Sequence, residues 1–162
     1  FPTFGWPKSR TEFIIAGGLK ALTQSIENSE DDIKSAKKMS ADKKISSGDI
    51  ILALSANGNT LFTNEVIKFS NSRKALTVGI TNNHKTLLEK NSKLTLVVNT
   101  GAELVAGSTR LKAGTIQKIV LNIISTLVFV KLGCVEQGLM VNMRPSNCKL
   151  RKRKNLINKI LS

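Results

Sequence analysis

Residues 101–126, GAELVAGSTRLKAGTIQKIVLNIIST, decide the fold that we expect for this chain. A loop of small residues, Gly107-Ser108-Thr109, carries two hydroxyl groups and runs directly into a long apolar segment. The backbone N–H groups at a helix start have no partner inside the helix, so they suit an anionic, polyhydroxylated ligand. A simple N-cap would also explain Ser108 or Thr109, because Ser and Thr are common capping residues. The stretch therefore predicts a loop-to-helix junction with the composition of a ligand site.

Four short apolar segments have the length of buried strands: residues 13–16, 50–54, 76–80 and 94–98. Helical spacing follows the first of them over residues 19–26, a second helix is expected through Lys38, and a third over residues 61–69. Apolar strands that alternate with helices predict a parallel sheet covered on both faces. We expect an α/β fold, a flavodoxin-like three-layer sandwich, formed by residues 1–162 as a single domain.

The most apolar run, residues 119–132, is predicted to be a core helix. It is shorter than the roughly 18 residues needed to span a membrane, and polar residues such as Asn122 and Ser125 interrupt it. Its apolar positions lie nearly all round the helix, which is typical of a buried element. We therefore expect no membrane partner.

Ligands of open parallel sheets bind outside the carboxyl ends of the strands. Three loops are expected at that edge: Gly17-Gly18, the segment Ser55-Ala56-Asn57-Gly58-Asn59-Thr60 (the SANGNT loop), and the Gly107 loop. The pattern predicts that these three loops open onto one crevice.

The net charge of the chain is +14, and two explanations are open. One is binding to nucleic acid or to an anionic membrane. The other, which we favour, is a lysine-rich chain from an AT-rich gene whose charges are spread over solvated faces, apart from the run KLRKRK at residues 149–154. Aromatic residues make up only 4%, so platforms for base stacking are few, and we expect no nucleic-acid partner.

Metal ligands are scarce in this sequence. Cys134 and Cys148 are the only cysteines and His84 is the only histidine, so no metal set of plausible ligand number can be assembled. Two reduced cysteines are the default for a cytosolic protein, and the first residues lack the basic and apolar regions of a signal peptide. We expect a cytoplasmic protein without metal or organic cofactor.

The string GSTRLKAGTxQKxVLNxIST at residues 107–126 closely resembles the signature of the N-acetylmuramic acid 6-phosphate etherases, a family with a sugar-isomerase-type domain. Further matches are IIAGG at residues 14–18, NSED at 28–31 where the family has GAED, and LMV at 139–141. The resemblance covers nearly the whole chain but only the middle half of a complete member. It implies a partial sugar-isomerase-type domain without the family's upstream phosphate loop, GTSGR, or its C-terminal helical region.

The resemblance implies a lyase that cleaves the D-lactyl ether of its substrate by β-elimination and hydration. Two glutamates form the family's acid–base pair, which suits a proton that must be removed and a leaving group that must be protonated. Glu30 matches one glutamate, whereas the other corresponds to a position just before Phe1. A solvated acid at a helix start is the alternative explanation for Glu30, and Asp31 and Asp32 would play the same part.

The resemblance also implies a set of substrate-binding residues. Ser108 and Thr109 are the best candidates because their hydroxyls both donate and accept, and Glu103 and Lys112 stand as the family has them. Lys112 faces either the phosphate or the outer surface of the helix. The SANGNT loop departs from the family's AASGRT, since Asn57 replaces a serine and Asn59 an arginine, which weakens sugar and phosphate contacts. The loop's candidate ligand residues are Asn57, Gly58, Asn59 and Thr60, of which Gly58 and Thr60 keep the tight turn and the helix start.

Several functions are consistent with these residues. The first is the etherase of amino-sugar recycling, impaired in this chain and assembled as a homodimer around a sugar phosphate, as the family's sites are. The alternatives are a non-catalytic sugar-phosphate-binding regulator on the same fold, similar to glucokinase regulatory protein, and an inactive, decayed fragment. A basic nucleic-acid binder is the most distant alternative.

Overall fold

The structure, a computed structural model, describes residues 3–161 of the chain. These residues form two compact units. Residues 13–119 make up the first, which we call the sheet unit. Residues 3–12 and 120–161 make up the second, the helical unit.

Three parallel strands in the order β1-β2-β3 form the sheet: β1 Ile50–Leu54, β2 Leu76–Thr81 and β3 Leu94–Val97. Helix α1, Ile33–Asp42, precedes β1 in the chain. Helix α2, Leu61–Ser72, lies between β1 and β2, and helix α3, Leu87–Asn91, lies between β2 and β3. The predicted α/β class, with a parallel sheet flanked by helices, is confirmed. The strands expected at residues 50–54, 76–80 and 94–98 and the helix expected over residues 61–69 are present, each within a few residues of its predicted ends.

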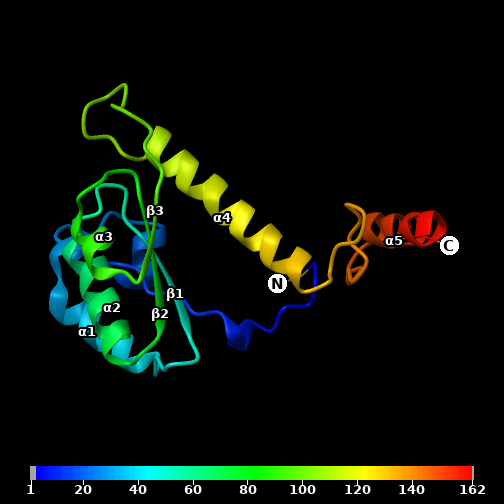
Figure 1. Cartoon of the computed structure of the whole chain (residues 1–162), viewed down its shortest axis with the longest axis horizontal. Coiled ribbons are helices and arrows are strands. Elements are labelled where there is room, and N and C mark those ends of the chain that lie inside the picture. Colours follow the sequence, from blue (N-terminus) through cyan, green and yellow to red (C-terminus); the bar gives the residue numbers. More distant parts are fainter. Residues whose placement is uncertain (1–2, 162) are drawn as a thin grey trace. The chain divides into compact units, whose positions relative to one another are not determined.

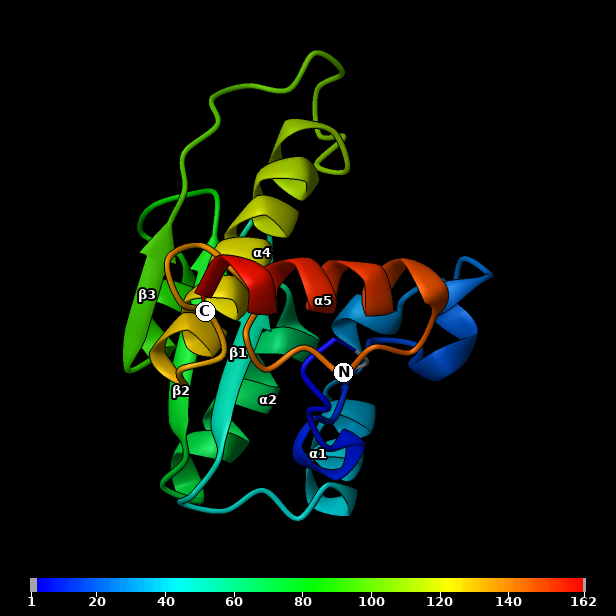
Figure 2. The same cartoon turned by 90° about the vertical axis from the view of Figure 1, so that its right-hand side faces the viewer.

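One face of the sheet carries the core. Ile51 and Ala53 of β1 point toward α1, α2 and α3 and contact two clusters of buried side chains. The buried apolar members of the two clusters are Ala36, Ala53, Phe62, Val66, Ile67 and Leu88. Figure 1 shows the three helices together on this side of the strands, and Figure 2, turned by 90°, shows α2 behind β1.

The opposite face of the sheet is apolar and largely open. Strand register puts Leu52, Val78 and Leu94 side by side on it, because paired residues of parallel strands point to the same face. Five of its side chains are 38–65% exposed: Ile50, Leu52, Leu76, Leu94 and Leu96. Helices α1–α3 therefore cover one face of the sheet and leave this one uncovered.

The prediction of a strand at residues 13–16 is wrong. The backbone there is irregular, Phe13 is 63% exposed, and Ile14 and Ala16 pack as side chains against the cluster between α1 and α2. The segment has a buried strand's composition because its side chains are partly buried, but it does not pair with the sheet. The tight turn expected at Gly17 and Gly18 is present, with both residues at positive φ, +78° and +68°.

Of the first two predicted helices, the one over residues 19–26 is wrong and the one expected through Lys38 is present as α1, which continues to Asp42. A 3₁₀ helix, Gly18–Leu22, replaces the helix expected over residues 19–26, and Leu19 is 76% exposed, so its apolar spacing does not reflect burial. Helix α1 begins at Ile33, where the Asp32 carboxylate accepts a hydrogen bond from the Ser35 N–H at 2.9 Å. The acidic segment before α1 thus contributes its N-cap.

Helix α4, Lys112–Lys131, was expected to be a core helix, and its burial contradicts this. Only 6% of its most apolar 18-residue window is buried, and Ile123, Leu127 and Val128 are each 44–55% exposed. The prediction is wrong because a helix with apolar side chains all round is buried only where other elements pack on every side of it. Few of the described residues pack against this helix. By length and composition alone, with a mean hydropathy of 1.6, α4 could cross a membrane.

The helical unit holds together around aromatic and apolar side chains. Phe129 stacks on Phe4 with ring centroids 4.6 Å apart and meets Trp6 edge-on at 5.8 Å. Met143 is 2% exposed. The last helix, α5, spans Cys148–Leu161 and starts three residues after Pro145. The Asn147 side chain caps it by accepting from the Leu150 N–H at 2.9 Å.

Candidate functional site

The SANGNT loop leaves the carboxyl end of β1 and is held by its own hydrogen bonds. The Ser55 hydroxyl lies 2.9 Å from the Thr60 hydroxyl and accepts from the Gly58 N–H at 3.1 Å. The Asn57 side-chain oxygen accepts from the Asn59 N–H at 2.7 Å and from the Ser55 hydroxyl at 3.1 Å. Asn57 thus satisfies the turn from within, as Asn commonly does in tight loops.

Gly58 is required at the centre of this loop. Its φ is +76°, and a Cβ added there would lie 2.5 Å from the Thr86 Cβ. The Leu88 N–H and the Asn64 side chain both donate to the Gly58 carbonyl, at 2.9 and 3.2 Å. The tight turn expected at this position is present, and its close approach to Thr86 leaves no room for a side chain.

Two other side chains fasten the loop to its surroundings. Asn64, which is 3% exposed, also donates to the Thr60 carbonyl at 2.9 Å and accepts from the Asn91 side chain at 3.0 Å. The Asn59 side-chain oxygen accepts from the Leu87 N–H at 3.0 Å, at the start of α3. Asn59, predicted to contact ligand in place of an arginine, is therefore engaged with α3.

Asn82 connects three elements at the carboxyl edge of the sheet. Its backbone N–H donates to the Ala56 carbonyl of the SANGNT loop at 3.1 Å. Its side chain donates to the Val98 carbonyl at 2.8 Å and accepts from the Gln117 side chain of α4 at 3.0 Å. The loop after β1, the residue after β3 and the first turns of α4 therefore meet at this residue.

Glu103 caps the start of α4. Its two carboxylate oxygens accept from the Lys112 N–H at 3.0 Å and the Ala113 N–H at 2.9 Å. The Ala113 N–H lowers the pKa of the Glu103 carboxyl from its ordinary value; partial desolvation opposes this, and the Lys112 N–H and charge add to the lowering. This carboxylate occupies the backbone groups that an anionic ligand would use.

The hydroxyls of the Gly107 loop lie just before this helix start. Ser108 is half-buried and Thr109 is exposed, and their backbones form turns in which the Leu111 N–H donates to the Ser108 carbonyl. Lys112 is exposed at the first position of α4. The roles of Ser108, Thr109 and Lys112 in ligand binding stay predictions.

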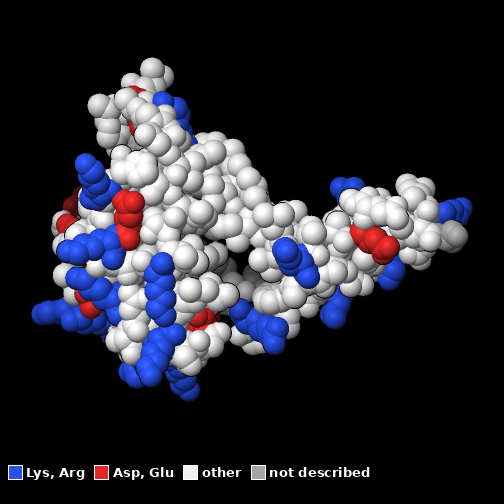
Figure 3. Space-filling model, viewed as in Figure 1, with Lys and Arg blue, Asp and Glu red and all other residues white. Residues whose placement is uncertain are grey.

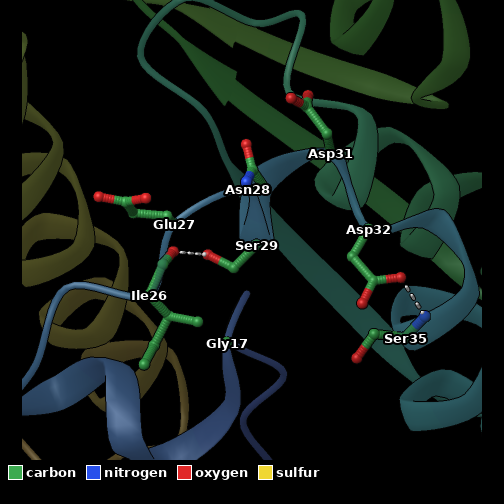
Figure 4. Close-up of a pocket in the computed structure, with 8 residues that line it drawn as sticks. All are labelled: Gly17, Ile26, Glu27, Asn28, Ser29, Asp31, Asp32 and Ser35. Carbon is green, nitrogen blue, oxygen red and sulfur yellow. Dashed lines mark hydrogen bonds between the residues drawn. The ribbon is translucent and has the colours of Figure 1, made fainter.

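Glu30 lies in a 3₁₀ turn, Ser29–Asp31, beside an open pocket of about 470 Å³. Glu30 is exposed and does not line this pocket. The lining residues are Gly17, Ile26, Glu27, Asn28, Ser29, Asp31, Asp32 and Ser35. Figure 4 shows their carboxyl groups pointing in different directions, with Asp32 turned to Ser35. Neither the SANGNT loop nor residues 103–112 contribute to the pocket, and the catalytic role of Glu30 stays a prediction.

The structure thus links the SANGNT loop to α4, while Gly17 lines a pocket to which neither the SANGNT loop nor residues 103–112 contribute. The single crevice expected for the Gly17-Gly18, SANGNT and Gly107 loops stays a prediction. Hydrogen bonds through Asn82 connect the SANGNT loop to α4, whereas Glu30 lies in a turn beside a separate pocket that it does not line. Sequence reasoning missed Asn64 and Asn82, because a buried asparagine with several partners has no local signature. Among residues 3–161, no group of three or more His, Cys, Asp or Glu side chains could hold a metal ion.

The fold is that of a SIS domain. The model of the SIS domain family matches residues 10–130, and the chain belongs to that family.

Among members of known name, the chain is similar to N-acetylmuramic acid 6-phosphate etherases. It is 38% identical to that of Oceanobacillus iheyensis over 156 residues, covering 96% of this chain and 53% of the relative. It is 41% identical to that of Staphylococcus epidermidis over 149 residues, covering 92% of this chain and 50% of the relative. The chain therefore spans about half the length of the curated relatives it matches.

A solved structure also aligns with the chain, at a low level of similarity. It is that of the Vibrio vulnificus NanR protein complexed with ManNAc-6P, which is 17% identical with a TM-score of 0.48 and covers 80% of this chain and 42% of that one.

Proposed function

We propose that this chain forms part of a lyase that cleaves the D-lactyl ether of N-acetylmuramic acid 6-phosphate, giving N-acetylglucosamine 6-phosphate and D-lactate. The observation that carries the proposal is the 37–41% identity to etherases over nearly the whole chain. The carboxyl edge of the sheet, where the SANGNT loop and α4 meet, is the place where such a fold binds its ligand.

The reaction proposed for this site is an elimination followed by hydration. A carboxylate removes the proton from C2 of the ring-opened sugar, the C3–O bond breaks, and lactate leaves as its oxygen gains a proton. Water then adds across the C2–C3 double bond, so that one water is consumed for each lactate released. In this proposal Glu30 is one carboxylate of the pair and Ser108 and Thr109 hold the substrate.

The chain as it stands is expected to release lactate at or near background. One glutamate cannot readily act as base at C2 and as acid for the leaving oxygen, because the two roles need opposite protonation states. General acid–base assistance contributes about 10²–10⁴-fold per group. Robust lactate release by the 162-residue chain alone would refute the requirement for a second carboxylate.

A chimera tests the assignment of Glu30. The upstream part of the Oceanobacillus iheyensis relative, fused in frame before this chain, is expected to restore lactate release. In that chimera Glu30→Gln should lower the chemical step by at least about 10²-fold with little change in ligand affinity, as for a group used mainly in the transition state. Asp31→Asn is the matched control, since Asp31 is an exposed carboxylate of the same turn. If the chimera tolerates Glu30→Gln but is inactivated by Asp31→Asn, the catalytic carboxylate is Asp31 and the proposed role of Glu30 is wrong.

A non-catalytic sugar-phosphate-binding regulator is the second candidate. Two observations weigh against a catalytic site: the side chains of Asn57 and Asn59 are engaged with the loop's own backbone and with α3, and Glu103 occupies the start of α4. Calorimetry with N-acetylglucosamine 6-phosphate separates the two functions. Binding to the chain, together with a chimera that binds the sugar phosphate but releases no lactate, would favour the regulator.

The proposed assembly is a homodimer in the cytoplasm with a sugar phosphate as its ligand. The open apolar face of the sheet supports self-association, because exposed apolar patches of this kind mark interaction surfaces. Sedimentation equilibrium of the chain and the chimera tests the dimer, and a monomer at micromolar concentration in both would contradict it.

A further inference from the structure

Helix α5 concentrates the positive charge of the chain. Six of its fourteen residues are Lys or Arg and none is acidic: Lys149, Arg151, Lys152, Arg153, Lys154 and Lys159. The described part of the helical unit as a whole holds ten basic and two acidic residues. Figure 3 shows basic groups projecting from several sides of the segment that Figure 1 labels α5. None of these residues belongs to the proposed sugar-phosphate site.

One side of α5 packs inward and another is open. Ile157 is 5% exposed and Leu150, seven residues before it, is half-buried, so these two mark the more buried side of the helix. Leu156 and Ile160 are 59% and 56% exposed. They are four residues apart and therefore lie on one side of the helix.

Basic residues share that open side. Lys152, Leu156 and Ile160 follow one another at intervals of four residues. Lys149 lies seven residues before Leu156, and Arg153 lies seven residues before Ile160. At 3.6 residues per turn these five side chains form one continuous strip, and all five are exposed. We call this strip the basic-apolar face of α5.

We propose that the basic-apolar face of α5 binds peripherally to an anionic phospholipid surface. A helix that presents aliphatic side chains beside Lys and Arg lies in the interface of such a membrane, with its apolar groups among the acyl chains and its charges at the headgroups. The long stems of Lys and Arg allow the charges to remain at headgroup level while the helix sinks. The proposal departs from the expectation, made from sequence, of a protein without a membrane partner.

Lipid fits this strip better than nucleic acid. Phosphate backbones are bound by charge and bases by aromatic stacking, and α5 contains no aromatic residue. Exposed Leu156 and Ile160 would add nothing to phosphate contacts, whereas in a membrane interface they are removed from water. The apolar pair therefore distinguishes the two partners experimentally.

The test uses the full chain with two kinds of vesicle, pure phosphatidylcholine and phosphatidylcholine mixed with phosphatidylglycerol, in a co-sedimentation assay. Binding is expected to the mixed vesicles only and to weaken as salt is raised. The triple variant Lys149→Gln/Lys152→Gln/Arg153→Gln should lower the partition coefficient about 100-fold, since each basic residue near an anionic surface contributes about fivefold. The matched control Lys20→Gln/Lys34→Gln/Lys38→Gln removes the same charge from exposed positions of the sheet unit and should change binding by less than about fivefold.

A second variant separates lipid from other polyanions. Leu156→Ser/Ile160→Ser keeps every charge and should lower vesicle binding at least tenfold, with retention on a heparin column unchanged. Far-UV circular dichroism confirms that each variant keeps its helix content. Equal losses in the two triple glutamine variants would mean that net charge alone drives binding. Unchanged vesicle binding by the serine variant would mean that the strip does not enter lipid. Either result, or tighter binding to duplex DNA than to the mixed vesicles, overturns the proposal.

Discussion

Replacing Gly58 by alanine should destabilise the sheet unit by about 3 kcal/mol. Two terms make up this figure. A residue with a Cβ at φ +76° costs roughly 1–2 kcal/mol relative to glycine. The new Cβ would also meet the Cβ of Thr86 at 2.5 Å, and relieving such an overlap typically costs about 1–3 kcal/mol.

The loop has little freedom to relax around the new methyl group. The Gly58 N–H donates to Ser55 and the Gly58 carbonyl accepts from Leu88 and Asn64, so a shift of the backbone loosens hydrogen bonds on both sides. Thr86 is held in turn, because its hydroxyl caps α3 by accepting from the Glu89 N–H at 3.2 Å. The two terms are therefore expected to add.

Urea unfolding followed by far-UV circular dichroism measures the loss. With a slope of about 2 kcal/mol per molar urea, the midpoint should fall by about 1.5 M. Gly101→Ala is the first control, since Gly101 has φ +65° but no atom within 4 Å of an added Cβ, and it should lose only about 1 kcal/mol. Gly48→Ala is the second, with open space and no positive φ, and should stay within about 0.5 kcal/mol of the parent. If Gly58→Ala unfolds at the midpoint of Gly101→Ala, the close approach to Thr86 contributes nothing and the reasoning fails.

Three other changes test the site and the sheet. Asn64→Ala should lower the free energy of unfolding by about 2 kcal/mol in the same urea titration, because it removes two hydrogen bonds to loop carbonyls and leaves the Asn91 side chain without its partner. A loss below about 0.5 kcal/mol would show that the loop keeps its structure without these hydrogen bonds. The lowered pKa of the Glu103 carboxyl means that its cap on α4 is fully present above the ordinary value of 4.5 and is lost as pH falls through the lower folded value. The protection factor of the Ala113 amide, its exchange rate compared with that of an unstructured amide at the same pH, should therefore fall in that range, and Glu103→Gln should remove this fall. Ile50→Lys, at a position 65% exposed on the open face of the sheet, should change the free energy of unfolding by less than about 1 kcal/mol and reduce the binding of an apolar dye. A loss of more than about 2 kcal/mol in the free energy of unfolding would show that something covers this face.

The sequence by itself determined the elements whose signals are local. The strands at residues 50–54, 76–80 and 94–98 are runs of apolar, mostly branched residues bounded by polar loops, and the structure pairs them in parallel. Gly58 and Thr60 predicted a tight turn followed by a helix start, and the structure has both. These predictions succeeded because backbone sterics and strand burial depend on residues close together in the chain.

Pairing and burial were decided by the tertiary structure. Residues 13–16 have the composition of a strand, but they bury their side chains against α1 and α2 without joining the sheet, and composition cannot distinguish the two. Residues 119–131 have the composition of a core helix, yet most of that part of α4 is exposed, because burial requires neighbours that a periodic pattern does not supply.

The same limit governs the candidate site. Asn82 joins the ends of the strands to α4 over 35 residues, and Glu103 reaches across nine residues to take the helix start that was expected to hold a ligand. A hydrogen bond depends on the distance and direction between two groups in space, and the folded chain sets both for residues that the sequence keeps far apart.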